Sequence, residues 1–362
     1  MRALAVGCEG IMNRRAAAYV LAIALWIVPA ADAQAPARAA AHPAAPCRAP
    51  VGAAALARTH KLAAQGSANA ECALGSAHYL GQGVPQDYAR AAAWYRKAAA
   101  HGNADAEYNL GGDYEHGQGV PRDYARATAL WRKAAAQGNA RAEVNLGVLY
   151  EHGQGVPEDY AQAAAWYRRA AAQGLARAEL ALGALYDLGK GEPRDYAEAA
   201  AWFQKAAAQG LAEAQYDLGL LYESGHGVPL DYARAAVCLR DAAMQGNAGA
   251  EDNLGVLYSS GKGVPQDDAQ ATAWYRKAAA QGLAGAEFGL GLGYEYGEGV
   301  QKDYVAAYKW FLVARAGAKP GSAAHKAAES YMHSLAARMT PAQIAAAQAS
   351  AARWWRAHRK HP

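Results

Sequence analysis

The polar side chains best suited to binding chemistry in this sequence recur at intervals of 36 residues. Asparagine or aspartate fills one position of this period, glutamate a second and tyrosine a third. The residues concerned are Tyr108, Asn109, Glu115, Asn145, Glu151, Tyr216, Asp217 and Asn253. Side-chain amides donate to and accept from a peptide backbone whatever its sequence, and a row of carboxylates favours a basic ligand. If one face of the fold holds these rows, they offer non-covalent binding of an extended polypeptide. The alternative is a solvated face that only keeps the protein soluble.

Two other arrangements raise the question of catalysis or metal binding. Ser259 and Lys262 match the S-x-x-K nucleophile motif of penicillin-recognising enzymes. That chemistry needs Ser and Lys on one helical turn, however, whereas Gly261 and Gly263 lie in the predicted inter-helix loop. The S-D-N and K-T-G partner motifs are also absent from the sequence. His116 and His152 lie one period apart, but two histidines without further ligands make a weak metal site. The sequence therefore predicts no catalytic residue, no metal and no cofactor.

The recurring positions belong to an internal repeat of fixed length. The segment Asn103-Ala-Asp-Ala-Glu-Tyr-Asn-Leu-Gly returns in closely similar form from Asn139. The period is 36 residues without insertion, which is typical of stacked helical hairpins. The seven units are 67–102, 103–138, 139–174, 175–210, 211–246, 247–282 and 283–318.

The sequence of each unit predicts two helices joined by a glycine-rich loop. In unit 103–138, the first helix (helix A) is expected over about 104–115 after Asn103, a plausible N-cap. Asp123 is expected to cap the second helix (helix B), which should end near Gln137. Gly111 carries no side chain, so we expect helix B to approach helix A closely there.

Helix B is expected to bury one apolar face. In unit 103–138 the predicted core residues of this helix are Tyr124, Ala127, Leu130 and Trp131. The Leu130 position is tryptophan in five other units, and we expect those rings to fill the space left by the alanines. Cys238 occupies the same position in unit 211–246 and is expected to be a small buried residue.

The repeat carries the pattern A-x-A-x-x-x-L-G-x-x-Y, then G-x-G-V-P-x-D-Y, then A-x-x-W-Y-x-K-A-A-x-Q-G. This pattern resembles the Sel-one-like repeat family, which is related to tetratricopeptide repeats. The resemblance covers 67–318, about 70% of the chain, and Glu192, Asp268 and Gln301 depart from it in single units. It implies an all-α, right-handed superhelical solenoid of seven stacked antiparallel helix pairs. It also implies that helix A lines a concave groove, and that the protein is a binding scaffold rather than an enzyme.

Both ends of the repeat array are expected to be caps. Residues 51–66 are expected to form a lone helix over the first repeat. The C-terminal region, 319–362, is expected to contain a helix over 322–338 and another that opens at Thr340-Pro341. The tail 353–360 mixes arginine and lysine with two tryptophans. We expect it to cover the last repeat; the alternative is peripheral contact with an anionic membrane or cell-wall polymer.

The N-terminus has the order of a signal peptide over 1–33. Arg14 and Arg15 precede an apolar run over 16–28, and Ala31-Asp32-Ala33 forms a small-residue cleavage site. An Ala/Pro-rich linker over 34–50 follows. We therefore expect an exported protein, either in a bacterial periplasm or secreted. Cys47 and Cys72 could then pair as a disulfide in that oxidising compartment.

Composition and charge limit the classes of molecule that the protein could bind. Ninety-nine of the 362 residues are alanine, which suits thin layers of closely packed helices. The net charge is +4, but residues 67–308 carry −9, so the repeats would repel nucleic acid. We expect a monomeric scaffold that binds proteins or peptides through the helix-A groove. The alternatives are a cell-envelope hydrolase or penicillin-binding repeat protein, and a peptidoglycan-associated structural protein.

Overall fold

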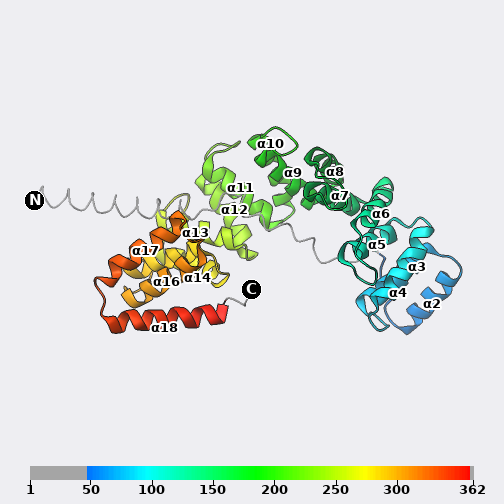
Figure 1. Cartoon of the computed structure of the whole chain (residues 1–362). Coiled ribbons are helices and arrows are strands. Elements are labelled where there is room, and N and C mark those ends of the chain that lie inside the picture. Colours follow the sequence, from blue (N-terminus) through cyan, green and yellow to red (C-terminus); the bar gives the residue numbers. More distant parts are fainter. Residues whose placement is uncertain (1–46, 359–362) are drawn as a thin grey trace, which may run out of the picture. The chain divides into compact units, whose positions relative to one another are not determined.

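The computed structural model describes residues 47–358 as an all-α protein. Seventeen helices and no strand occur within that range (Figure 1). The two helices of each repeat pack against each other, which confirms the expected solenoid of stacked helix pairs. No helix in the described range is both long enough and apolar enough to cross a membrane. The expected signal peptide and residues 34–46 of the expected linker lie outside the described residues.

Helices A and B alternate along the repeats, with three more helices at the ends. The A helices are α3 (Ala68–Leu80), α5 (Ala104–His116), α7 (Ala140–His152), α9 (Ala176–Leu188), α11 (Ala212–Ser224), α13 (Ala248–Ser260) and α15 (Ala284–Tyr296). The B helices are α4 (Tyr88–Ala100), α6 (Tyr124–Ala136), α8 (Tyr160–Ala172), α10 (Tyr196–Ala208), α12 (Tyr232–Met244), α14 (Asp268–Ala280) and α16 (Tyr304–Gly317). The end helices are α2 (Ala53–Ala64), α17 (Ala323–Ala336) and α18 (Pro341–His358).

These helices fall into two compact units. The first unit holds α2 to α9 and most of α10, and the second holds the end of α10 and α11 to α18. Within the first unit, a disulfide between Cys47 and Cys72 ties the segment before α2 to α3, with 5.5 Å between the two Cα atoms. The structure therefore forms the cysteine pair that the sequence left open.

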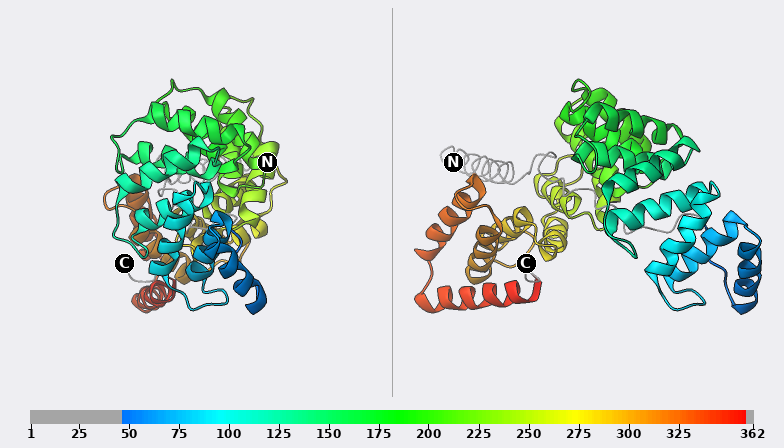
Figure 2. Two further views of the ribbon diagram at one scale, coloured as in Figure 1. Left: turned by 90° about the vertical axis from the view of Figure 1, so that its right-hand side faces the viewer. Right: turned by 45° about the vertical axis from the view of Figure 1, so that its right-hand side comes forward.

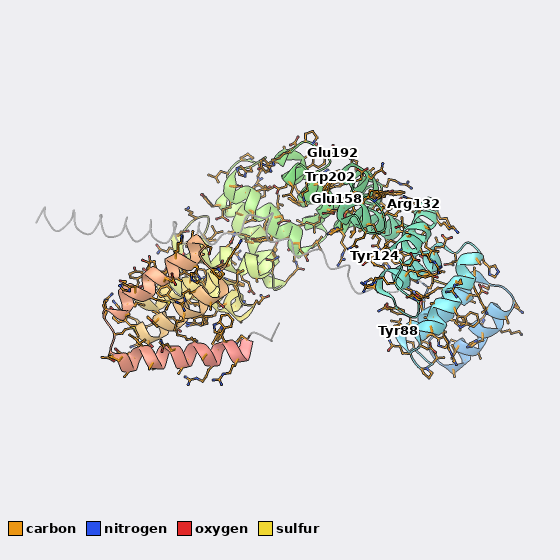
Figure 3. All side chains as sticks on the ribbon, in the orientation of Figure 1. Tyr88, Tyr124, Arg132, Glu158, Glu192 and Trp202 are labelled. Carbon is orange, nitrogen blue, oxygen red and sulfur yellow. A yellow bond between two sulfur atoms is a disulfide. The ribbon has the colours of Figure 1, made fainter. Side chains whose placement is uncertain are left out.

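The helix ends follow the predicted capping residues. Asn103 Oδ1 accepts a hydrogen bond from the Ala106 amide at 2.8 Å, and Asp123 Oδ1 accepts one from the Arg126 amide at 3.0 Å. In the loop between the two helices, Gly119 has φ +68°, and an added Cβ would overlap the Tyr88 carbonyl. The loops of five repeats therefore pack on the start of helix B in the preceding repeat, at Tyr88, Tyr124, Tyr160, Tyr232 and Asp268; Tyr88 and Tyr124 are labelled in Figure 3.

In the core of each repeat, a large helix-B side chain packs directly against a helix-A glycine. The pairs are Gly75–Tyr95, Gly111–Trp131, Gly147–Tyr167, Gly183–Phe203, Gly219–Leu239, Gly255–Tyr275 and Gly291–Phe311. All seven helix-B partners are at most 3% exposed. The close approach predicted at Gly111 is confirmed, and the Trp131 indole N–H also donates to the Tyr108 carbonyl at 2.9 Å.

The position one residue before this helix-B partner, that of Leu130, was expected to be in the core. Except in the last repeat its side chains are only partly buried, and the leucine and tryptophans there pack against the core from its edge. Four of its tryptophans are half-buried, as are Leu130 and Cys238, whereas Trp310 is buried. Successive helical residues are rotated by about 100°, so only one of two neighbours can point straight at helix A. In several repeats a cation covers the outer ring; Lys205 Nζ lies 3.8 Å from the Trp202 ring centroid (Figure 3).

Buried hydrogen bonds tie the start of helix A to the residue that follows helix B within single repeats. Gln137 Nε2 donates to Glu107 Oε2 at 2.7 Å, and Gln173 Nε2 donates to Glu143 Oε2 at 2.9 Å. The same pairing recurs between Gln281 and Glu251 at 2.9 Å. These carboxylates are at most 4% exposed, so the bonds supply the partners that burial of a charged group requires.

Helices α17 and α18 close the second unit, and both pack against α16 (Figure 2). Trp354 meets Trp310 edge to face, with 4.7 Å between ring centroids. Lys309 Nζ lies 4.9 Å from the Trp354 ring centroid. Trp354 and Trp355 are partly buried against the core of the last repeats. The tail tryptophans thus make the contacts expected of a cap.

Candidate functional site

The candidate binding residues all lie on helix A, in α5, α7, α11 and α13. The sequence predicted an exposed face, and the structure corrects this. Tyr108, Asn109 and Asn253 are 7%, 0% and 5% exposed. The other five are half-buried: Glu115, Asn145, Glu151, Tyr216 and Asp217. The reason is that neighbouring A helices lie close enough for their side chains to hydrogen-bond.

In the first unit, these side chains are largely engaged within the protein. A hydrogen bond joins the Tyr108 hydroxyl to the Asn145 side chain. The Tyr167 hydroxyl donates to Glu151 Oε2 at 2.7 Å. Burial raises the pKa of Tyr108, while the charges of Arg141 and Arg177 act in the opposite direction. The first unit therefore presents a face with arginines beside its amides.

The two histidines that raised the question of a metal site each place a ring nitrogen near a backbone carbonyl of their own helix. His116 Nδ1 lies 3.0 Å from the Gly112 carbonyl oxygen, and His152 Nδ1 lies 3.1 Å from the Val148 carbonyl oxygen. His116 Nδ1 is also 3.3 Å from a Glu115 carboxylate oxygen. Burial raises the pKa of Glu115, and the neighbouring His116 lowers it. Residues 47–358 contain no group of three or more His, Cys, Asp or Glu side chains that could hold a metal ion.

In the second unit, three carboxylates surround a tyrosine on α11 and α13. We call this set the acidic face: Tyr216, Asp217, Glu223, Asp252 and Asn253. Burial first, and then the charges of the three carboxylates, raise the pKa of Tyr216. The Tyr216 ring lies against α13, because a Cβ added to Gly249 would be 2.8 Å from Tyr216 Cζ.

Glu223 connects the two helices of the acidic face. Asn253 Nδ2 donates to Glu223 Oε2 at 3.4 Å. Burial raises the pKa of Glu223, whereas the Lys262 charge and the Asn253 hydrogen bond lower it. Asn253 thus positions an acidic side chain, a role that an exposed amide row would not have suggested.

Asp252 is a site residue that the sequence analysis missed. It is 9% exposed, and burial raises its pKa to about 7. The sequence did hold a signal, because Asp252 replaces an apolar or aromatic residue found in the other repeats. The equivalent residues are Cys72, Tyr108, Val144, Leu180, Tyr216 and Phe288.

Ser259 and Lys262 do not form a nucleophile and base pair. The Ser259 hydroxyl donates to the Val256 carbonyl at 3.0 Å and lies 3.5 Å from the Tyr275 hydroxyl. Lys262 follows the end of α13, and its Nζ lies 5.1 Å from the Tyr232 ring centroid. The S-x-x-K chemistry needs both residues on one helical turn, so this geometry does not support the hydrolase alternative.

Comparison with known families gives one match that spans most of the chain. The family described as Sel1 repeat matches seven consecutive segments, each starting one residue after a unit defined by the sequence period. The segments are 68–103, 104–139, 140–175, 176–211, 212–247, 248–283 and 284–316. No curated protein is similar enough to this chain to count as a match.

Solved structures include similar repeat proteins. A Sel1 repeat protein from Oxalobacter formigenes is 32% identical with a TM-score of 0.61, and the similarity covers 78% of this chain and 80% of that chain. A protective antigen of uropathogenic Escherichia coli with an SLR fold is 29% identical with a TM-score of 0.41. That similarity covers 84% of this chain and 79% of the antigen.

Proposed function

The chain belongs to the Sel1 repeat family, and from that premise we propose that it is an exported, non-catalytic scaffold that binds extended segments of other proteins on its helix-A face. Sel1 repeat proteins are generally protein-interaction scaffolds. The sequence order of a signal peptide over 1–33 supports export.

The acidic face of the second unit is the observation that carries the binding proposal. Asp217 and Glu223 are half-buried beside Tyr216, so water hydrates their charges less fully than at an open surface. A cationic side chain placed there gains electrostatic energy and specificity. The first-unit face has Arg141 and Arg177 in its neighbourhood. We therefore assign a lysine- or arginine-rich extended segment to the acidic face rather than to the first unit.

A binding measurement with defined peptides tests this assignment. Changing Asp217→Asn and Glu223→Gln together removes two charges with little change in shape. We expect the variant to bind a fluorescent lysine-rich peptide about tenfold more weakly than the unmodified chain, because tenfold corresponds to about 1.4 kcal/mol of lost attraction. Fluorescence anisotropy at low and physiological salt measures the affinity, which should fall as salt screens the charges.

The matched control removes two charges elsewhere in the same unit. Glu213 and Glu329 are exposed, so the variant Glu213→Gln with Glu329→Gln should bind like the unmodified chain. A glutamate-rich peptide of equal length should bind weakly to all three proteins. Equal peptide affinity for the face variant and the control variant would show that the acidic face is not the binding site.

Export is tested separately by the mass of the mature protein. Expressed with residues 1–362 in a Gram-negative host, the chain is expected in the periplasmic or secreted fraction without residues 1–33. Intact mass spectrometry of that fraction identifies the cleavage position. Recovery of the full-length mass from the cytoplasm alone would contradict export and would leave the peptide-binding test unaffected.

A further inference from the structure

The outer face of α12 differs from the same face in every other repeat. Val237 and Met244 on this face, and Leu230 two residues before the helix, are 53%, 74% and 57% exposed and are among the few large apolar side chains exposed within residues 47–358. The Met244 position is alanine in the other repeats, and the Leu230 position is glutamine, glutamate, arginine or lysine. The Val237 position is alanine in all but the last repeat. Three apolar substitutions have therefore gathered on one short surface.

The same face has lost its usual outer ring and the cation that covers it. Cys238 stands at the tryptophan position, and Asp241 stands where most repeats have lysine or arginine. Cys238 is half-buried, and it is the free cysteine of the described range. Cys238 is followed three residues later by Asp241, at the position from which Lys205 covers Trp202 in the preceding repeat.

The charges on this face are complementary to those of an identical face turned through 180°. Arg234 precedes Cys238 by four residues and Asp241 follows it by three, so all three lie on one side of the helix. Both charges act on the Cys238 thiol. Arg234 is exposed and pairs with Asp231 of its own chain at 3.4 Å. When two α12 helices pair antiparallel about the Val237–Cys238 position, Arg234 of each copy comes opposite Asp241 of the other and can exchange that ion pair for one between copies. Met244 of each copy then lies near the start of the other copy's α12, which Leu230 precedes by two residues.

We propose that the outer face of α12 is a contact between two copies of this chain, with the two Cys238 side chains beside the twofold axis. Such an isologous contact needs one self-complementary patch, which the apolar and charged residues of this face supply. The proposal replaces the monomer expected from the sequence. It is independent of peptide binding, because the acidic face lies on α11 and α13.

The size of the face sets the strength of this contact. Thirteen helical residues span about 20 Å, and a helix is about 10 Å wide, so one helix face covers about 200 Å² on each copy. Even both copies together fall well below the roughly 1,600 Å² of a standard interface. We therefore expect a weak, concentration-dependent dimer that an intermolecular disulfide makes permanent. With glutathione disulfide as oxidant, two Cys238 S–H bonds break and one S–S bond forms. The S–S bond of glutathione disulfide breaks, and its two sulfurs take up the two protons and become glutathione thiols.

Oxidation of the purified full chain tests the proposal. After incubation with glutathione disulfide, non-reducing electrophoresis and intact mass should show a dimer linked through Cys238. The variant Val237→Ala with Met244→Ala carries the residues found in other repeats, so it should keep its helix content and thermal transition. We expect its rate of dimer formation to fall by about tenfold, in line with the loss of apolar contact.

Charge reversal supplies the discriminating control. Arg234→Glu alone and Asp241→Lys alone place like charges opposite each other and should both slow dimer formation. The double variant restores opposite charges and should recover most of the original rate. A chain that yields only the Cys238–glutathione mixed disulfide, or a dimer whose rate no variant changes, would overturn the proposal.

Discussion

Replacing Asp113 by leucine is expected to raise the free energy of unfolding of the first unit by about 2–4 kcal/mol at pH 7. Asp113 is fully buried on α5, and neither carboxylate oxygen has a hydrogen-bond partner within residues 47–358. Burial raises its pKa from 3.8 to about 8. At pH 7 the folded chain keeps the proton on Asp113, whereas the unfolded chain has lost it. This difference lowers the free energy of unfolding by about 4 kcal/mol, at 1.36 kcal/mol per pKa unit.

Leucine is the appropriate replacement because four other repeats already use it. The equivalent residues are Leu149, Leu185, Leu221 and Leu257, which are at most 6% exposed. The side chain of leucine is larger than that of aspartate, and the resulting compression offsets part of the gain. Urea unfolding, followed by circular dichroism, measures the difference between the variant and the unmodified chain.

The pH dependence separates the buried acid from a general packing effect. Asp113→Asn removes the ionisable group with almost no change in volume. Below pH 3.8 both folded and unfolded forms of Asp113 are protonated, so this group causes no loss of stability. Between pH 3.8 and about 8 only the unfolded form ionises, so the unmodified chain should lose stability relative to Asp113→Asn as pH rises. A stability difference that stays constant from pH 4 to 8 would contradict the assignment.

The local structure of each repeat could be predicted because it depends on short-range chemistry. Asn103 and Asp123 cap their helices through hydrogen bonds to amides three residues later, and the sequence alone specifies such caps. Gly111 predicted close helix contact in the same way, because the absence of a side chain leaves room for the other helix. The 36-residue period then extended both predictions to every repeat.

The rotation of each helix could not be read from the period. A repeat shows which positions are equivalent, but the direction in which they point depends on the packing of neighbouring helices. Trp131 rather than Leu130 faces Gly111, and Asn109 is buried rather than exposed for this reason. The buried bond between Gln137 and Glu107 joins side chains thirty residues apart, a separation that no helical spacing suggests.

The two buried aspartates were visible in the sequence as exceptions. Asp113 replaces an aliphatic residue of most repeats, and Asp252 replaces an apolar or aromatic one. Interpreting such an exception requires knowing that the position is buried, which the structure provides. Residues that break a repeat's pattern therefore indicate where individual repeats differ in stability or binding, whereas residues that follow it describe only the shared fold.

Gly147→Ala is expected to lower the free energy of unfolding by about 2–3 kcal/mol. In an ordinary helix interior the same change stabilises by about 1 kcal/mol, so the sign itself is diagnostic. An alanine Cβ would lie 2.6 Å from Tyr167 Cδ1, and Tyr167 is 1% exposed. The ring has little freedom to move away, because its hydroxyl donates to Glu151. Urea unfolding of the two proteins measures the change.

Gly219→Ala is the matched control in another repeat, and a double variant tests the cause. The partner there is Leu239, whose Cγ would lie 2.9 Å from the new Cβ and whose side chain can shift, so the loss should be about 1 kcal/mol. Combining Gly147→Ala with Tyr167→Leu removes the ring that causes the clash. The double variant should therefore lose less stability than the sum of its single variants. Strict additivity would mean that the glycine is needed for a reason other than space for the ring.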